Sequence, residues 1–179
     1  MSSLIHSVMD QRVQALEQAF ARIQRERMAD VPVLHPALQV QAVGFALEPG
    51  EEAEPSIAWG VLITPWFMNL IRLPLRSAEL LAPGSDAVRE MGGQPLDFIG
   101  AQEPWLGDGT LSRYELCSLF SPMFEFADQA AAVATAVEVL RLLRAPKPVP
   151  AAAVQPAPPM AAVPARRGFL FGRSASGAA

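Results

Sequence analysis

Cysteine is scarce in this sequence: the 179 residues include one, Cys117. A single thiol excludes an internal disulfide and every zinc site that is built from several cysteines. It fits a reducing compartment. Cys117 lies in the strand-like stretch YELCSLF, where it alternates with its neighbours as a small apolar residue would. We interpret it as a buried structural thiol, because a nucleophile needs a base and a lowered pKa that no motif here supplies.

Other groups that carry chemistry are also few. The two histidines, His6 and His35, have no carboxylate pattern near them and fit surface or helix-end positions. The glycines of GSDAVREMGG lack the spacing of nucleotide-binding loops. The carboxylates of Glu115, Glu125 and Asp128 fit solvated or helix-terminal charges, the last two in the first turn of a helix, where its dipole favours negative charge. We therefore predict no catalytic residue, no metal site and no cofactor.

Acidic residues are missing from the end of the chain. From position 145 onward there are four basic residues and no acid, so the first 144 residues carry a net charge of −8 and the remainder +4. An acidic body argues against a nucleic-acid-binding protein, which needs a basic face for phosphate. It favours cationic partners.

Long apolar runs are missing too. The longest uncharged apolar stretch, residues 57–71, is short for a membrane span and is interrupted by Gly60 and Pro65. The beginning, MSSLIHSVMDQR, lacks the basic and apolar regions of a secretory leader. We expect a cytoplasmic protein without membrane insertion.

What is present predicts two helices and several strands. Val13, Leu16, Phe20 and Ile23 recur at helical spacing, which predicts an amphipathic helix over 5–28. A second helix is predicted over 124–144 from its alanine-rich apolar periodicity. Between them, strands are predicted in the stretches LQVQAVGFAL, IAWGVLI, FMNLIRLPL, PLDFIGA and LSRYELCSLF. Residues 49–55 and 82–93 are expected to be loops, and 64–66 the turn of a hairpin.

This order of elements predicts an α+β fold. We expect an antiparallel β-meander with both long helices packed on one face of the sheet. Residues 1–144 would form a single domain. They are followed by a Pro/Ala-rich linker over 145–164, which has no pattern that could bury a face, and by a basic tail over 165–179.

Two stretches hold more aromatic and methionine side chains than a core requires. TPWFMNL lies at the hairpin turn, and LFSPMFEFADQA crosses from the last strand to the second helix. One interpretation is a core that packs this helix onto the sheet. The other is an apolar groove with a negative rim that binds an apolar, basic peptide. The candidate partner-binding residues are Trp66, Phe67, Met68, Phe120, Met123, Phe124, Glu125 and Asp128.

The same stretches carry a family resemblance. GVLITPWFMNLIRLP and CSLFSPMFEFADQ, in that order and with HPALQVQAVGF upstream, resemble the HybE-type nickel-iron hydrogenase assembly chaperones, which include HupJ-like and HoxT-like proteins. The resemblance covers about residues 16–143. It implies a cytoplasmic, non-enzymatic factor that engages the small-subunit precursor of an uptake hydrogenase through its twin-arginine leader. Such a factor holds back export until the cofactors are in place, and it is also implied to contact the large subunit and other maturation factors.

Two alternatives to leader binding stay open. One is a scaffold that joins the large and small hydrogenase subunits, and the other is a small thiol or redox protein of the same pathway. Some family members are fused to or encoded beside a rubredoxin. A chain whose one cysteine is Cys117 cannot bind rubredoxin-type iron, which needs four thiolates.

The tail itself resembles a twin-arginine signal. In ARRGFLFGR, the retained features of such a signal are Arg166, Arg167, Phe169 and Leu170. Our hypothesis is that this segment occupies the leader site when no client is bound. A flexible linker of this length reaches roughly 25 Å, which gives an effective concentration on the order of millimolar.

This hypothesis predicts the effect of removing the tail. Deletion of residues 165–179 should leave folding intact and tighten the binding of a client leader by a factor of a few, because the competitor is gone. Calorimetric titration of the full-length and truncated proteins with one leader peptide measures this. Unchanged or weaker binding by the truncated protein contradicts the hypothesis.

Overall fold

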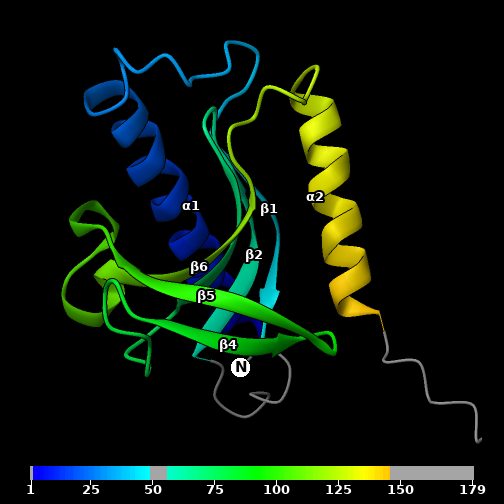
Figure 1. Ribbon diagram of the computed structural model, residues 1–179. Coiled ribbons are helices and arrows are strands. Elements are labelled where there is room, and N and C mark those ends of the chain that lie inside the picture. The colour runs from blue at the N-terminus through cyan, green and yellow to red at the C-terminus, as the bar shows by residue number, and fades with distance from the viewer. Residues whose placement is uncertain (1, 49–55, 146–179) are drawn as a thin grey trace, which may run out of the picture. The chain divides into compact units, whose positions relative to one another are not determined.

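Two long helices flank a six-stranded antiparallel sheet in the computed structural model, which describes residues 2–48 and 56–145 (Figure 1). The helices are α1 (Ser2–Glu26) and α2 (Gln129–Arg144). The strands are β1 (Gln41–Leu47), β2 (Ile57–Ile63), β3 (Met68–Pro74), β4 (Asp86–Met91), β5 (Gln94–Gln102) and β6 (Arg113–Phe120). Short 3-10 turns η1 (Pro104–Leu106) and η2 (Gly109–Ser112) join β5 to β6. The α+β prediction is confirmed.

The order of the strands, β1-β2-β3-β6-β5-β4, departs from a simple meander. The chain crosses from β3 to the far edge, makes the β4–β5 hairpin, and returns as β6 between β5 and β3. Our expectation of a loop over 82–93 was wrong for β4. Polar residues alternate along this strand, so the sequence did not indicate it. The strand ends in the two-residue turn Gly92-Gly93, where both residues have positive φ, 59° and 77°. Such a turn matches the twist of two antiparallel strands.

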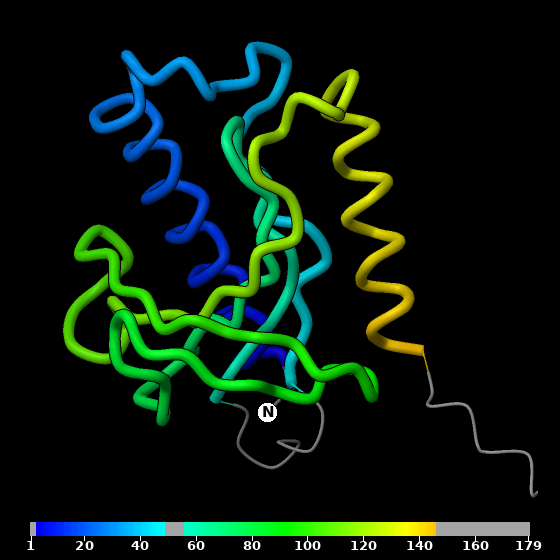
Figure 2. The backbone as a smooth tube through the Cα atoms, viewed as in Figure 1, coloured from blue at the N-terminus to red at the C-terminus, as the bar shows by residue number. Residues whose placement is uncertain are grey.

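The two helices do not share a face of the sheet, which corrects the second part of the fold prediction. Leu16 and Phe20 of α1 pack with Leu62 of β2, whereas Ala136 and Leu140 of α2 pack in a separate cluster on the other face. Figures 1 and 2 show one helix on each side of the sheet. The physical reason lies in β2 and β3, where every residue is buried. Uninterrupted apolar runs such as IAWGVLI belong to strands that are covered on both faces.

The second helix starts five residues later than predicted. The side chain of Asp128 caps it by accepting a hydrogen bond from the Ala131 N–H at 2.9 Å. Glu125 therefore precedes the helix and is not in its first turn. Between β6 and the cap, the chain makes a turn in which the Phe126 N–H donates to the Met123 carbonyl at 3.2 Å. The aromatic residues of 120–126 thus lie in a connection and not along a helix face.

Arg12 anchors the first helix to the sheet. Its Nε donates to the Pro74 carbonyl at 2.9 Å, and its two terminal nitrogens donate to the carbonyls of Leu106 at 2.7 Å and Leu111 at 2.6 Å. Pro74 ends β3, Leu106 ends η1 and Leu111 lies within η2. Arg22 of α1 and Arg27, just after its last residue, each place a guanidinium group 4.1 Å from the ring centroid of Trp105 in η1. One helix therefore holds the β5–β6 connection in place.

Both helices also cover the β1 edge of the sheet. Glu17 of α1 accepts a hydrogen bond from the Ala42 N–H at 2.7 Å. Arg144 of α2 donates to the Gly44 carbonyl at 2.5 Å. Exposed strand edges invite pairing with other chains, and side chains that occupy the backbone groups block it. The β1 edge is thus closed from two sides.

A buried ion cluster on the α2 side joins three strands and the residue that follows β1. Glu115 of β6 is fully buried and accepts hydrogen bonds from Arg72 of β3, from Arg89 of β4 at 2.5 Å, and from the Leu81 N–H at 2.9 Å. Arg72 also binds Glu48, next to β1, at 2.6 Å. Burial alone would raise the pKa of Glu115, but these donors outweigh it and hold the pKa below its ordinary value of 4.5.

This cluster predicts a pH-dependent stability. Glu115→Gln should lower the free energy of unfolding by about 3–5 kcal/mol at pH 7, because it leaves buried arginine charge unpaired. The folded-state pKa is depressed, so the carboxylate stabilises the protein fully above its ordinary pKa and loses this effect as the pH falls through the folded pKa. The difference from wild type should therefore shrink below about pH 4.5.

Urea unfolding at pH 7 and pH 3 measures both effects. The matched control is Glu138→Gln, which breaks an exposed pair with Arg141 on α2 and should leave the unfolding midpoint unchanged. A Glu115→Gln variant as stable as wild type at pH 7 would contradict the stabilising role that we assign to the Glu115 carboxylate.

Candidate functional site

Three segments meet at one end of the sheet, at the top of the view in Figure 1. They are the β2–β3 turn, the β6–α2 connection and the segment 31–38. The His35 N–H donates to the Pro65 carbonyl at 2.8 Å, and Ser121 Oγ donates to the Trp66 carbonyl at 3.4 Å. Met68 lies opposite Phe120 in the β3–β6 ladder. The two aromatic stretches singled out in the sequence therefore lie side by side.

Thr64 fixes the conformation of the β2–β3 turn. Its buried hydroxyl accepts hydrogen bonds from the N–H groups of Trp66, at 3.3 Å, and Phe67, at 3.0 Å. Its own N–H donates to the Phe67 carbonyl at 2.8 Å. The turn is rigid enough to hold two large aromatic side chains in defined positions at the end of the sheet.

These two aromatic side chains belong to the α1 side of the molecule. Phe67 packs edge-on against Phe20 at a centroid distance of 5.7 Å and against Trp66 at 5.5 Å. Both Trp66 and Phe67 remain partly exposed. They combine packing with an accessible surface, which is the arrangement that aromatic anchors of binding sites adopt.

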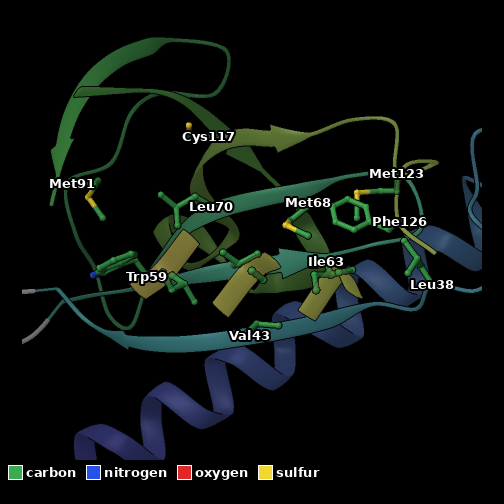
Figure 3. Packing of buried hydrophobic residues seen from close by; sticks show 14 of the residues in the cluster. Leu38, Val43, Trp59, Ile63, Met68, Leu70, Met91, Cys117, Met123 and Phe126 are labelled. Atoms are coloured by element: carbon green, nitrogen blue, oxygen red, sulfur yellow. The ribbon is translucent and has the colours of Figure 1, made fainter. Parts of the chain in front are cut away.

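The predicted methionines lie instead in the core on the α2 side. Met68 and Met123 are fully buried, and Figure 3 shows them beside Phe126 at one end of this cluster. Phe120 is partly buried and packs edge-on against Phe126 at 5.1 Å. The core interpretation therefore holds for the methionines, whereas the groove interpretation stays a prediction for the exposed residues. The methionines give no adaptable surface, because their side chains do not reach it.

The accessible part of this end is smaller than the predicted set. Phe124 is 56% exposed and lies 6.4 Å from the His35 ring, while Glu125 and Asp128 are exposed beside it. We define the aromatic end as Trp66, Phe67, Phe120, Phe124, Glu125 and Asp128 together with Val33 and His35. Val33 and His35 were not among the predicted residues, since the segment VPVLHP has no periodicity that points to a site.

Three groups that the sequence analysis considered for chemistry are engaged or buried. Asp128 is engaged as a helix cap, and Glu115 is held by two arginines in the ion cluster. Cys117 is buried, and burial followed by the nearby Asp97 charge raises its pKa, which disfavours the thiolate. Within residues 2–48 and 56–145, no three His, Cys, Asp or Glu side chains are grouped to hold a metal ion.

The predicted tail residues Arg166, Arg167, Phe169 and Leu170 lie outside the described residues. Among the helices that are described, none combines the length and the apolar character needed to cross a membrane.

The fold is a sheet between two helices, with partly exposed aromatic side chains at one end. Residues 11–172 match the family described as [NiFe]-hydrogenase assembly, chaperone, HybE, and the chain belongs to that family.

Similar proteins support this placement. The chain is 48% identical to protein HoxT of Cupriavidus necator over 170 residues, which cover 90% of this chain and 89% of that protein. It is 40% identical to the hydrogenase expression/formation protein HupT of Azotobacter chroococcum, over 90% and 95% of the two chains. The solution structure of HybE from Escherichia coli shares the fold, with a TM-score of 0.56 and 23% identity over 92% and 91% of the two chains.

A relative named as a probable rubredoxin, HupJ of Rhodobacter capsulatus, is 35% identical over 73% of this chain but over 44% of its own length. More than half of that protein therefore has no counterpart in the match. The single cysteine of the present chain cannot supply the four thiolates of a rubredoxin.

The division of the predicted site residues between core and surface can be tested by measurements of stability. Met123→Ala should lower the free energy of unfolding by about 2–5 kcal/mol, because it leaves a cavity in the core. Phe124→Ala should change it by less than about 0.5 kcal/mol, because the side chain is largely exposed. Urea denaturation of both variants measures these changes. A large loss of stability in Phe124→Ala would mean that this side chain belongs to the core.

Proposed function

We propose that this protein is a non-enzymatic maturation chaperone of the cytoplasm that binds the small-subunit precursor of a nickel-iron uptake hydrogenase. On this proposal the hydrogenase subunits are its partners, and the twin-arginine leader of the small subunit is its direct ligand. Binding holds back export until the cofactors have been inserted. The family supports the chaperone role, and the aromatic end supports the choice of a peptide ligand.

The observation that carries the proposal is the chemistry of the aromatic end. Trp66, Phe67 and Phe124 offer apolar contact area, and the carboxylates of Glu125 and Asp128 lie beside it. A twin-arginine leader has the complementary composition, with two arginines followed by an apolar segment. The net charge of −8 over the first 144 residues also favours the approach of such a peptide.

The alternative of a thiol or redox accessory protein has less support. Cys117 is buried with a raised pKa, so neither its access nor its ionisation suits exchange chemistry. A scaffold that joins the two subunits would use the same exposed aromatic residues, but it would not distinguish the two arginines of a leader. Recognition of the arginines is therefore the property to measure.

The decisive experiment is calorimetric titration of the protein lacking residues 165–179 with a leader peptide of the cognate small subunit. A second peptide has both arginines replaced by lysine, which keeps the charge but loses the planar guanidinium fork. Micromolar binding that weakens at least tenfold with the lysine peptide supports leader recognition. Absence of binding by both peptides moves the contact to folded parts of the subunits and favours the scaffold.

Variants locate the site. Phe124→Ala should weaken binding of the arginine peptide by about tenfold, which corresponds to about 1.4 kcal/mol. The control is Leu142→Ala, because Leu142 is also 56% exposed but lies near the other end of α2. Equal effects of the two variants would mean that the aromatic end is not the binding site.

A further inference from the structure

One polar side chain inside the α1 side of the sheet has no hydrogen-bond partner. Asn69 of β3 is 4% exposed, and in the described part of the chain nothing donates a hydrogen bond to its buried Oδ1 atom. A buried polar atom without a partner costs free energy, and such atoms are rare in folded proteins. Asparagine is also depleted in strands. A residue that disfavours the fold in two ways indicates a role other than folding.

The register places Asn69 between an apolar and a polar neighbour. On the α1 face its partner on β2 is Leu62, which is fully buried, and its partner on β6 is Ser118, which is exposed. The neighbours on the same face along the chain are Phe67 and Ile71, both in the α1-side cluster. The side chains of Leu62, Phe67 and Ile71 cannot donate a hydrogen bond. The polar side of this position therefore faces Ser118.

The sheet is open beside Ser118. The Glu103 N–H donates to the Ser112 carbonyl at 2.8 Å, and hydrogen-bonded pairs alternate along an antiparallel ladder. From this bond onward, the backbone groups of Leu116 and Ser118 point toward the β5 side. The β5–β6 ladder nevertheless ends at the pair Ile99–Leu116, where β5 turns away from β6 (Figure 1). In the described part of the chain no strand pairs with Ser118 on that side, so a ligand can approach Asn69 over it.

The groups around Asn69 suit an arginine side chain. The Oδ1 atom of Asn69 and the Oγ atom of Ser118 can both accept a hydrogen bond, and a guanidinium group carries five donors and no acceptor. Its flat face also stacks on aromatic rings, and Phe67 beside Asn69 is partly exposed. Asp97, two residues before Ile99 on the same face of β5, is exposed and adds a negative charge. A lysine ammonium suits the position less well, because it is a strongly hydrated point charge without a planar fork.

We propose that Asn69 and Ser118 bind the guanidinium group of one arginine of the client leader, while the apolar part of the leader lies over the aromatic end. This inference rests on the proposed leader binding and deepens it, because it assigns arginine recognition to two residues on the α1 face. Glu125 and Asp128 then attract the peptide through charge, which lysine shares, whereas Asn69 distinguishes arginine from lysine.

The unpaired amide predicts that stability and binding respond differently to one substitution. Asn69→Leu replaces the amide by an apolar side chain of similar size, which removes an unpaired polar atom from the core. The urea midpoint of this variant should equal or exceed that of wild type. Its affinity for the arginine leader should fall about tenfold, as expected for the loss of a hydrogen bond to a charged group. Its affinity for the lysine peptide should not change.

The test uses the full-length protein, urea unfolding, and calorimetric titration with the arginine and lysine leader peptides. A second variant, Ser118→Ala, should lower the preference for the arginine peptide by a factor of several without lowering the urea midpoint. The matched control is Ser77→Ala, because Ser77 is also exposed but follows β3 at the other end of the sheet. This control should bind both peptides as wild type does.

The outcomes separate this inference from the proposal of leader binding. Loss of the arginine preference in Asn69→Leu, without loss of stability, supports the arginine site. An arginine preference that survives in Asn69→Leu overturns this site and leaves leader binding intact. Lower stability of Asn69→Leu or Ser118→Ala than of wild type also overturns it, because the amide would then serve the fold. Absence of binding of both peptides by wild type overturns the two proposals together.

Discussion

The buried carboxylate of Glu115 is the interaction on which the arrangement of this sheet depends. It pairs with arginines from β3 and β4, and these ion pairs add to the backbone ladder that joins β6 to β3. Arg72 extends the cluster to Glu48 at the end of β1. An apolar pair could stabilise the same place as well, but a charge that must be paired specifies its partners. We infer that the cluster specifies the crossover order, in which β6 returns between β3 and β5.

The sequence predicts the helices and five of the six strands, because these have clear periodicity. It does not predict β4, whose residues DAVREM alternate without a strong apolar face, although the glycine pair after Met91 is a hairpin signal that could have been used. The placement of the two helices on opposite faces of the sheet could also have been predicted. IAWGVLI has no polar alternation, and a strand of that kind needs a cover on both faces.

The residues of the candidate site were predictable, but its place in the fold and its detail were not. In a meander of the five predicted strands, the β2–β3 turn and the end of the last strand would lie at opposite ends of the sheet. The additional strand β4 reverses the direction of β6, which then runs antiparallel to β3 and ends beside this turn. Sequence spacing also does not indicate which side chains turn inward. Met68 and Met123 fill the core, Phe124 remains at the surface, and the contribution of His35 depends on a hydrogen bond between the 31–38 segment and Pro65. These distinctions come from tertiary packing, which sequence spacing does not contain.

The guanidinium of Arg12 sets an order of events during synthesis. Its acceptors at Leu106 and Leu111 are 94 and 99 residues away along the chain, and Arg144 reaches back 100 residues to Gly44. The first helix leaves the ribosome early but cannot complete its docking until both 3-10 turns exist. The β1 edge stays open until the second helix arrives. Contacts of such separation are slow to form and leave apolar surface exposed in the meantime. The contacts that complete this fold therefore join the first residues of the domain to its last ones.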